Sequence, residues 1–316
     1  MSTSKMNLKK VVSDISGLKV QGAENIAKAS VKMLKYTALK SYTTSAKQFK
    51  LELVSTQKSL IDARPTEPCL RNTLKFITHD ISNHNLKSLQ EKIISNCQKA
   101  LRHFSDSNKV IVEIGAKKIK SGMTVYTHCH SSTVLGILKK AHDKGTRFKA
   151  CCTETRPKFQ GRITASDLAK YRVPVTLFVD SAMRQALKKS DIAFLGADAI
   201  TTEGKVINKI GSEMVAILCN KYDVPLYSCS NSWKFDPETV FGFEEPIEKR
   251  SEKEVWDKAP NKVEISNFAF ESVDSSLITG IISELGIYRP DVFVEEVKQN
   301  YPWMFKEIKK FFNMIF

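Results

Sequence analysis

After Gly122 the sequence alternates between short runs of β-branched or aromatic residues and longer segments with helical periodicity. Strands are predicted for MTVYTHC, RFKACCT, VPVTLFVD, IAFLGADAI and VPLYSCS, and helices for STVLGILKKAHDKG, ITASDLAKYR, SAMRQALKKS and GSEMVAILCNKYD. This alternation predicts an α/β fold with a doubly wound, Rossmann-like parallel sheet covered by helices. Since ligands of such sheets bind at the carboxyl ends of the strands, the residues that follow each run are the candidates for function.

The N-terminal part has a different pattern. From residue 7 to about residue 103 the periodicity is helical, as shown by Ile26, Met33 and Thr37 on one face. The polar stretch 105–108 (SDSN) predicts a boundary and a helix start. We therefore expect a helical N-terminal domain, residues 1–104, and a Rossmann-like domain, residues 105–316, which agrees with a length of 316 residues.

Two features near the C-terminus stand apart from the alternation. The charged stretch 244–262 predicts an exposed excursion before a last strand, KVEIS (262–266). The segment WMFKEIKKFFNMIF (303–316) predicts an amphipathic helix, either docked on the protein or lying on a membrane surface, and its short length favours docking.

The composition limits the classes of partner. With 49 Lys and Arg against 34 Asp and Glu, the net charge of +15 favours anionic partners such as phosphorylated metabolites or nucleic acids. Lysines occur along the whole length and no nucleic-acid-binding signature is present, so a nucleic-acid partner is not favoured. No run reaches the roughly 18 apolar residues of a membrane span, and the polar start lacks a signal peptide. We expect a cytoplasmic protein without a membrane partner.

The seven cysteines are an odd number and are scattered, with no CxxC pair. Reduced, buried and unreactive thiols are the ordinary outcome for such residues. His128 and His130 flank Cys129 on an extended segment, so a zinc site must be considered. Because no third and fourth ligand accompany them, we expect no metal and no cofactor.

Polar residues that a core does not need follow four predicted strands, in THCHSS, TETRP, VDSA and GADAI. Asp198 follows a strand end, where a carboxylate can exchange protons with a ligand, although an Asx turn or helix cap is an equally open alternative. Cys129 lies beside Ser131 and Ser132 at a predicted helix start. The free N–H groups there can lower the pKa of a thiol and can also bind phosphate.

Other basic and small residues are weaker candidates taken singly. Asn208 and Lys209 lie between a turn and a predicted helix, and Lys234 follows a predicted strand, so these lysines could bind phosphate or remain solvated on the surface. Gly22 leaves the backbone uncovered at a helix start, where a ligand can approach it. Arg64 precedes a proline and therefore lies outside a helix, where its guanidinium could bind a phosphate.

The motifs QGAxxIA, RPTxxxLxN, GAKKI, THCHSS, TETRPKFQG, VDSA, GADAI, INKIG and KF, in this order, resemble one superfamily. It unites ribose-1,5-bisphosphate isomerases, methylthioribose-1-phosphate isomerases and the regulatory α, β and δ subunits of initiation factor 2B. The resemblance runs from about Leu18 to Pro302 and is greatest to the archaeal ribose-1,5-bisphosphate isomerases. The methylthioribose branch usually has an asparagine and an arginine where this chain has His130 and Ala199. Regulatory subunits commonly lose the aspartate that is present here as Asp198.

The resemblance implies an isomerase that opens the ring of ribose 1,5-bisphosphate and moves hydrogen from C2 to C1, giving ribulose 1,5-bisphosphate in nucleotide degradation. It implies that Cys129 accepts a proton and Asp198 donates one, with direct hydride transfer as the alternative route. It also implies a homo-oligomer, a dimer or hexamer. The substrate ligands that it implies are Gln21, Gly22, Ala23, Glu24, Arg64, Ser131, Ser132, Thr133, Asn208, Lys209 and Lys234.

One residue departs from the family pattern. Gln21 stands where relatives usually have arginine, and the loss of a guanidinium would weaken a phosphate contact. Two other functions therefore remain open. One is the isomerisation of another pentose 1-phosphate, and the other is a non-catalytic, sugar-phosphate-sensing regulatory subunit that binds a translation factor.

Overall fold

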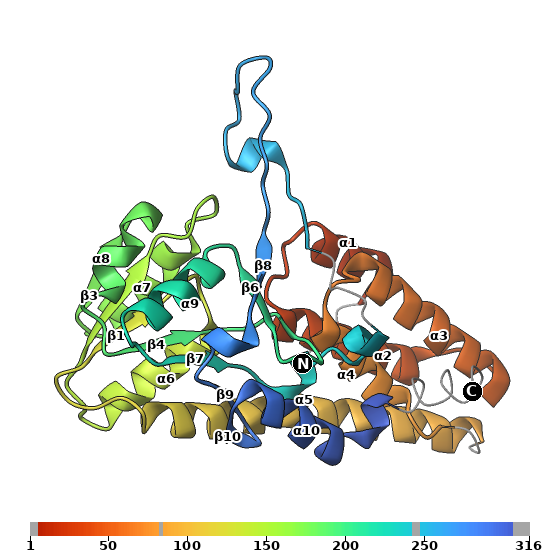
Figure 1. The fold of residues 1–316 in the computed structure, drawn as a ribbon. Coiled ribbons are helices and arrows are strands. Elements are labelled where there is room, and N and C mark those ends of the chain that lie inside the picture. The colour runs from red at the N-terminus through yellow and green to blue at the C-terminus, as the bar shows by residue number, and fades with distance from the viewer. Residues whose placement is uncertain (1–5, 82–84, 242–246, 306–316) are drawn as a thin grey trace. The chain divides into compact units, whose positions relative to one another are not determined.

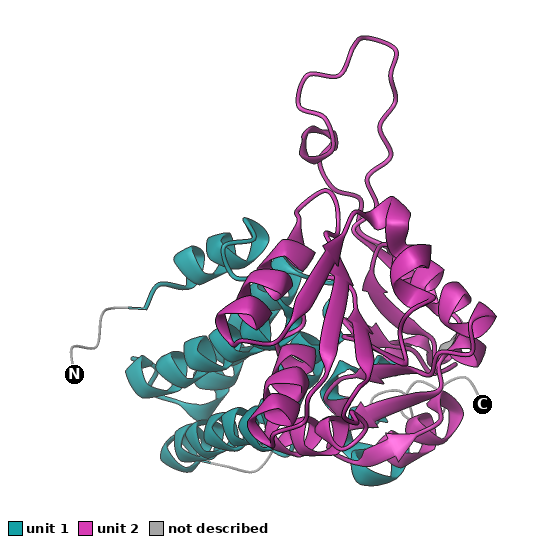
Figure 2. Cartoon of the chain, turned by 90° about the vertical axis from the view of Figure 1, so that its left-hand side faces the viewer, with its two compact units in different colours: residues 1–106, 233–237, 298–316 teal, residues 107–232, 238–297 magenta. Residues whose placement is uncertain are grey.

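The computed structural model describes residues 6–81, 85–241 and 247–305 (Figure 1). The chain forms two compact units (Figure 2). Unit 1 comprises Met1–Asp106, Trp233–Pro237 and Lys298–Phe316, and unit 2 comprises Ser107–Ser232 and Glu238–Val297. Among the described residues, no helix is long and apolar enough to cross a membrane.

Unit 1 is helical, as predicted, and contains α1 (Leu8–Ser16), α2 (Ala23–Lys40), α3 (Ala46–Ala63), α4 (Pro68–Thr78) and the first part of α5 (Leu86–Ala116). Local signals begin these helices. The side chains of Asn7 and Ser45 accept backbone N–H groups at the starts of α1 and α3, and a proline occupies the start of α4. The predicted face of α2 is buried at Ile26 and Met33.

The predicted helix start at residues 105–108 is wrong, since α5 runs unbroken through them. Phe104 and Ile111 are both buried and lie two turns apart, so the apolar stripe keeps its phase across the polar stretch. Capping residues therefore do not end a helix whose buried face continues on both sides.

Unit 2 is built on the predicted doubly wound sheet, in the order β10-β9-β7-β4-β1-β2-β3. Only the pairing of β10 with β9 is antiparallel. The strands are β1 (Thr124–Thr127), β2 (Lys149–Thr153), β3 (Val175–Phe178), β4 (Ile192–Leu195), β7 (Leu226–Cys229), β9 (Gly280–Ser283) and β10 (Gly286–Tyr288). The α/β fold class is thus confirmed.

The order of the strands reverses next to β1. The chain moves outward from β1 to β3 and then returns to place β4 on the other side of β1. Because such crossovers are right-handed, α6 (Ser132–Asp143) and α7 (Gln160–Lys170) cover one face, and α8 (Met183–Leu187) and α9 (Ser212–Lys221) cover the other. Ligands of this fold bind where the order reverses, at the carboxyl ends of β1 and β4.

A second, antiparallel sheet was not predicted. It has the order β5-β6-β8 and consists of β5 (Ala199–Ile200), β6 (Val206–Lys209) and β8 (Phe270–Val273). The predicted strand KVEIS is wrong, since residues 262–266 form no strand. Of its two strong β-formers, Val263 is 46% exposed and Ile265 is only half-buried, so the alternating residues have no core to pack against.

The remaining elements are short or lie near the C-terminus. The 3-10 helices are η1 (Asp180–Ala182), η2 (Ser232–Lys234), η3 (Pro237–Phe241), η4 (Glu252–Glu254), η5 (Ser275–Leu277) and η6 (Pro302–Phe305), and α10 spans Pro290–Asn300. Most of the predicted C-terminal amphipathic helix, residues 306–316, lies outside the described residues.

Candidate active site

Cys129 follows β1 with its backbone in the left-handed conformation, φ +66°, and is buried. Its N–H donates to Thr155 Oγ1 at 3.0 Å, and its carbonyl accepts from Thr164 Oγ1 at 2.8 Å. A left-handed conformation is costly for a residue with a side chain, so surrounding contacts must maintain it. The two threonine hydroxyls therefore fix the position of the thiol.

Thr155, whose hydroxyl accepts the Cys129 N–H, is itself held in place by a residue that follows β3. The N–H groups of Thr155 and Arg156 donate to the two carboxylate oxygens of Asp180, at 2.8 and 2.7 Å. Cys129, Thr155 and Asp180 follow β1, β2 and β3 respectively. Three of the polar strand ends identified in the sequence are thus linked by hydrogen bonds.

Burial raises the pKa of the Cys129 thiol to about 11. Asp198 and Asp180 add to this effect, whereas Lys209 and the backbone N–H of His130 oppose it. A helix start was expected to lower the pKa of this thiol. The pKa is raised instead, because the loss of hydration on burial outweighs the effect of the nearby N–H groups. Cys129 and Asp198 follow β1 and β4, and Lys209 ends β6, so the thiol pKa responds to a carboxylate and an ammonium group at neighbouring strand ends.

Asp198 lies three residues after β4, and it is half-buried. Its N–H donates to the carbonyl of Ile207 at 2.8 Å, which ties the end of β4 to β6. Nearby, a Cβ built on Gly196 would lie 3.0 Å from Ser131 Oγ and 3.9 Å from Asn208 Oδ1. The absence of a side chain at Gly196 therefore lets the start of α6 and strand β6 approach the end of β4.

The proposed ligands on β6 and α6 have defined local contacts. Asn208 Nδ2 donates to Ser212 Oγ at 2.9 Å, and Lys209 Nζ lies over the Phe270 ring, 4.3 Å from its centroid. Ser131 Oγ accepts the Val134 N–H and so caps α6. In the first turn of α6, Ser132 is exposed and Thr133 half-buried.

The two histidines beside Cys129 have structural roles. His128 Nε2 lies 2.8 Å from the Ile210 carbonyl, which can only accept, so Nε2 donates and Nδ1 accepts from Thr153 Oγ1 at 2.6 Å. Burial lowers the pKa of His128, which favours this neutral form. His130 Nδ1 lies 3.0 Å from Thr164 Oγ1. In the part of the chain that the structure describes, no three His, Cys, Asp or Glu side chains are grouped to hold a metal.

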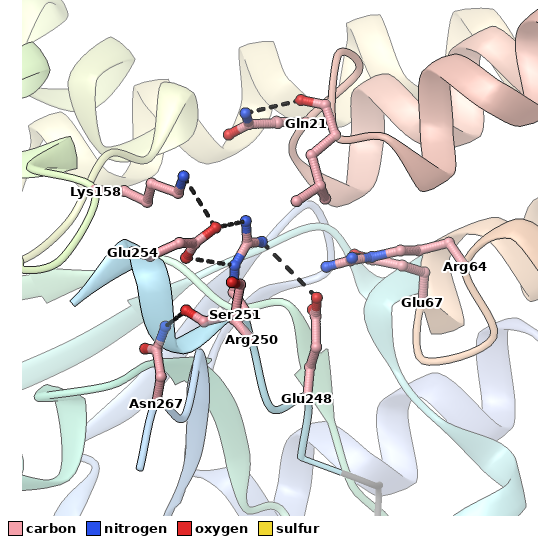
Figure 3. Close-up of polar contacts among 10 residues, drawn as sticks. Gln21, Arg64, Glu67, Lys158, Glu248, Arg250, Ser251, Glu254 and Asn267 are labelled. Carbon is pink, nitrogen blue, oxygen red and sulfur yellow. Dashed lines mark hydrogen bonds and ion pairs between the residues drawn. The ribbon is translucent and has the colours of Figure 1, made fainter. Parts of the chain in front are cut away.

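The proposed ligands of unit 1 near residue 21 lie at the start of α2. Gln21 is exposed, and its amide donates to the backbone carbonyl three residues earlier at 2.9 Å (Figure 3). Gly22 has φ +84° and immediately precedes α2, while Ala23 is its buried first residue. Glu24, in the first turn, pairs with Lys28.

A second group of unit 1 surrounds Cys69. Arg64 ends α3, and its Nε lies 3.4 Å from Glu67 Oε1 (Figure 3). Burial raises the pKa of the Cys69 thiol, with Lys234 opposing this and Glu24 and Glu67 adding to it. Their influence on one thiol places Lys234, Glu24 and Glu67 in the same part of unit 1.

Sequence reasoning missed the roles of Thr155, Thr164, Asp180 and His128. Thr155 and Asp180 lie in motifs already noted at strand ends, so their place at the carboxyl edge of the sheet was a usable signal. Thr164 lies within α7, and its hydroxyl donates to the carbonyl of Cys129, which is 35 residues away in the sequence. No local pattern indicates such a contact.

Together, a buried thiol, a carboxyl group and an ammonium group at the ends of β1, β4 and β6 form an arrangement suited to proton transfer on an anionic substrate. The thiol and the carboxyl group can each gain or lose a proton. The ammonium group can bind a phosphate or stabilise an oxyanion.

Comparison with known proteins gives consistent results. The model of the initiation factor 2 subunit family matches residues 19–290. A ribose 1,5-bisphosphate isomerase of Pyrococcus furiosus is 35% identical, over 94% of each chain. The enzyme of that name from Methanocaldococcus jannaschii is also 35% identical, over 95% of this chain and 97% of its own. A methylthioribose-1-phosphate isomerase of Fervidobacterium nodosum is 33% identical, over 80% of this chain and 77% of its own.

Solved structures agree on the fold. The crystal structure of a translation initiation factor 2B protein from Pyrococcus horikoshii has a TM-score of 0.79 at 25% identity, covering 91% of this chain and 98% of its own. The 5-methylthioribose 1-phosphate isomerase of Pyrococcus horikoshii has a TM-score of 0.75 at 24% identity, covering 94% of this chain and 88% of its own.

Proposed function

We propose, from the premise that this chain belongs to the initiation factor 2 subunit family, that it converts ribose 1,5-bisphosphate into ribulose 1,5-bisphosphate. Relatives of that name match at 34–35% identity over most of their length, which favours this substrate over another pentose 1-phosphate. The observation that carries the proposal is that Cys129 and Asp198 follow the paired strands β1 and β4, where the order of the strands reverses. A purely regulatory subunit does not need such a pair.

The reaction requires one proton donor and one proton acceptor. The phosphate on C1 locks the sugar as a ring, so Asp198 donates a proton to the ring oxygen as the bond from that oxygen to C1 breaks. The Cys129 thiolate then removes the proton from C2 to give an enol. The Cys129 thiol returns this proton to C1, while the Asp198 carboxylate takes the proton of the C2 hydroxyl and the ketone forms at C2. The net change is the movement of hydrogen from C2 to C1.

The charges of the pair are coupled in a way that suits these roles. An ionised Asp198 raises the pKa of Cys129, because a second negative charge nearby is unfavourable. When Asp198 carries the proton to be donated, this opposition disappears and the cost of forming the thiolate falls, with Lys209 opposing the remaining effect of burial.

Two substitutions test the assignment. Asp198→Asn removes the transferable proton and Cys129→Ser replaces the thiol by a much weaker acid, so each should lower kcat about a hundredfold or more while substrate still binds. Because both groups act in one reaction, the double variant should be little worse than the poorer single variant. The measurement is ketose formation by purified protein. Normal turnover by Asp198→Asn would show that Asp198 is not the proton donor, and no ketose formation by the unaltered chain would make the regulatory-subunit reading the better one.

The route of the hydrogen is tested separately. Proton transfer through Cys129 allows exchange with solvent, so turnover in heavy water should place deuterium at C1 of the product. Direct hydride transfer from C2 to C1 would leave the product free of solvent deuterium. In that case Cys129 would not be the proton acceptor.

The remaining ligand assignments rest on the matching motifs. Arg64 is proposed to bind a phosphate present in both ground and transition states, so Arg64→Ala should raise KM more than it lowers kcat. Arg102→Ala, on an exposed position of α5, is the matched control. Gln21, Gly22, Ala23, Glu24, Ser131, Ser132, Thr133, Asn208, Lys209 and Lys234 complete the proposed substrate ligands.

The wider assignment includes a cytoplasmic homo-oligomer, a dimer or hexamer, that uses no metal or other cofactor. Light scattering at assay concentration should give a multiple of the 35.6 kDa chain mass. Elemental analysis of active protein should find less than one metal ion per chain. A stoichiometric metal whose removal abolishes turnover would overturn the metal-free mechanism.

A further inference from the structure

The end of β6 carries two of the proposed substrate ligands, Asn208 and Lys209, and a short turn then leads into α9. Strand β8 lies beside β6 and pairs with it, placing Glu271 opposite Asn208 and Phe270 opposite Lys209 (Figure 1). The Lys209 ammonium lies over the Phe270 ring, and it lowers the pKa of the Cys129 thiol. The position of this ammonium therefore depends on what holds the turn after β6.

His128 holds one side of the turn. It precedes Cys129, its side chain is 2% exposed, and its Nε2 donates to the Ile210 carbonyl at 2.8 Å. Gly211 has φ +100°, and a Cβ at this position would lie 2.8 Å from His128 Nε2. Only glycine therefore lets the imidazole come this close to the turn. Because β1 and β6 belong to different sheets, this contact joins the two sheets of unit 2.

A buried chain of hydroxyl groups orients the His128 ring. Since Nε2 carries the proton, Nδ1 accepts from Thr153 Oγ1 at 2.6 Å. The Thr153 hydroxyl has then used its only hydrogen, so it accepts from Tyr126 OH at 3.2 Å. Tyr126 and Thr153 are fully buried, and water does not compete for these bonds. The chain therefore selects the tautomer whose N–H faces the turn.

Glu271 on β8 holds the other side of the turn. Its carboxylate accepts the N–H groups of residues 211–213, the last of them at 2.8 Å. The Ile210 carbonyl and the Gly211 N–H belong to one planar peptide group. His128 holds the oxygen of this group and Glu271 holds its N–H. The peptide group therefore cannot rotate without breaking hydrogen bonds on both sides.

The neighbouring backbone groups are also paired, so the turn is fixed up to Lys209. The Ile210 N–H donates to the Ala269 carbonyl at 3.1 Å. The Ser212 hydroxyl donates to the Lys209 carbonyl at 2.6 Å. Each polar backbone group from the Lys209 carbonyl to the Gly211 N–H thus has a partner. The side chain of Lys209 extends from a backbone that is held on every side.

We propose that His128 and Glu271 are positioning residues of the reaction. Together they clamp the peptide group between residues 210 and 211, and the clamp places the Lys209 ammonium where it acts on the substrate and on Cys129. Neither residue has to touch the substrate. The role of Lys209 toward the substrate rests on the proposed function, whereas its effect on the Cys129 thiol does not require a substrate.

Kinetics of ketose formation test the clamp from both sides. His128→Phe keeps a ring but cannot donate, and Glu271→Leu removes the carboxylate. Each should lower kcat/KM about tenfold, because a displaced charge loses its alignment with the substrate. In a Lys209→Met background each should cost no more than about twofold, since no ammonium is left to place. His128→Gln, whose amide can donate in place of Nε2, should restore most of the rate.

A matched control and a test of folding accompany these variants. His142→Phe replaces a half-buried histidine of α6 and should leave kcat and KM unchanged. Circular dichroism verifies the folding of every variant. If His128→Phe or Glu271→Leu does not fold, His128→Asn or Glu271→Asp, which shorten the same side chains, takes its place in both measurements.

Alkylation of Cys129 by iodoacetamide tests the clamp without any sugar. At one fixed pH, Lys209 should accelerate the reaction of the unaltered chain, because it lowers the pKa of the thiol. This acceleration is the ratio of the rates with Lys209 and with Lys209→Met. It should be much smaller in His128→Phe and in Glu271→Leu. Easier access to the buried thiol would change both rates alike and leave the ratio as it is.

The outcomes separate the clamp from the proposed function. Losses that persist in full in the Lys209→Met background overturn the clamp, because His128 and Glu271 would then act on Cys129 directly or through packing. Unchanged kinetics and an unchanged alkylation ratio in both variants also overturn it. A reduced ratio supports the clamp whether or not ketose forms. A reduced ratio without ketose formation by the unaltered chain overturns only the isomerase assignment.

Discussion

At the scale of single residues, Cys129 is a thiol whose burial opposes its proposed ionised form. Its pKa is raised to about 11, with Asp198 adding to the effect of burial and Lys209 opposing it. The thiol is therefore protonated in the resting protein at neutral pH. Its ionisation depends on the charges of Asp198 and Lys209. The rate at which the thiol reacts therefore reports the effect of these two charges.

We expect alkylation of Cys129 by iodoacetamide to be slow at neutral pH and to accelerate about tenfold per pH unit, because only the thiolate reacts. At one fixed pH, Asp198→Asn should accelerate the reaction and Lys209→Met should slow it, since these changes remove a negative and a positive charge respectively. Mass spectrometry follows the modified peptide, with Cys129→Ser as the background. A rate that levels off below pH 9 would contradict the raised pKa.

The hydroxyl of Thr155 gives a second prediction at this scale. Thr155→Val leaves the buried Cys129 N–H without its acceptor, so the left-handed backbone should relax and displace the thiol. We expect kcat to fall about tenfold or more with KM little changed. Thr155→Ser retains the hydroxyl and should restore activity. Equal loss in both variants would show that Thr155 acts through packing.

At the scale of elements, the segment 233–237 belongs to unit 1 although its flanking sequence belongs to unit 2. Asn72 on α4 donates to the carbonyls of Trp233 and Phe235 at 2.9 and 2.7 Å, and Arg71 pairs with Asp236 at 2.9 Å. These contacts fix the backbone on both sides of Lys234.

Asn72→Leu should therefore affect both stability and substrate binding. Removing the amide leaves two buried carbonyls without that donor, and we expect the free energy of unfolding to fall by about 2 kcal/mol. Because Lys234 lies between them, KM should rise more than kcat falls. Urea unfolding and steady-state kinetics measure the two effects. Gln98→Leu, at an exposed position of α5, should change neither.

At the scale of the whole molecule, the net charge of +15 should serve the capture of an anionic substrate. We expect kcat/KM to fall as the salt concentration rises while kcat changes little, since salt screens long-range attraction and not the bound complex. A neutral osmolyte at matched osmolarity is the control. Tight, sequence-selective binding of RNA or DNA at physiological salt would count against this use of the charge.

The sequence by itself determined the fold class and the strand ends from which a site could be built. A strand buried on both faces is a short continuous run of apolar residues, and a helix buried on one face has apolar residues at helical spacing. These patterns are local, so β1, β4 and α6 could be predicted from the sequence. Cys129 and Asp198 were identified because a residue that follows a parallel strand lies at the ligand-binding edge whatever the order of the strands.

Only the tertiary structure decided the properties that depend on residues distant in sequence. The short strand β5 pairs with β6, and β6 pairs with β8 some sixty residues later, which no local pattern in GADAI or INKIG indicates. The unbroken α5 follows from a buried face that continues past the capping residues SDSN. The raised pKa of Cys129 follows from burial by surrounding elements. A sequence carries the local preference for charge at a helix start, but the desolvation that outweighs it exists only in the folded chain.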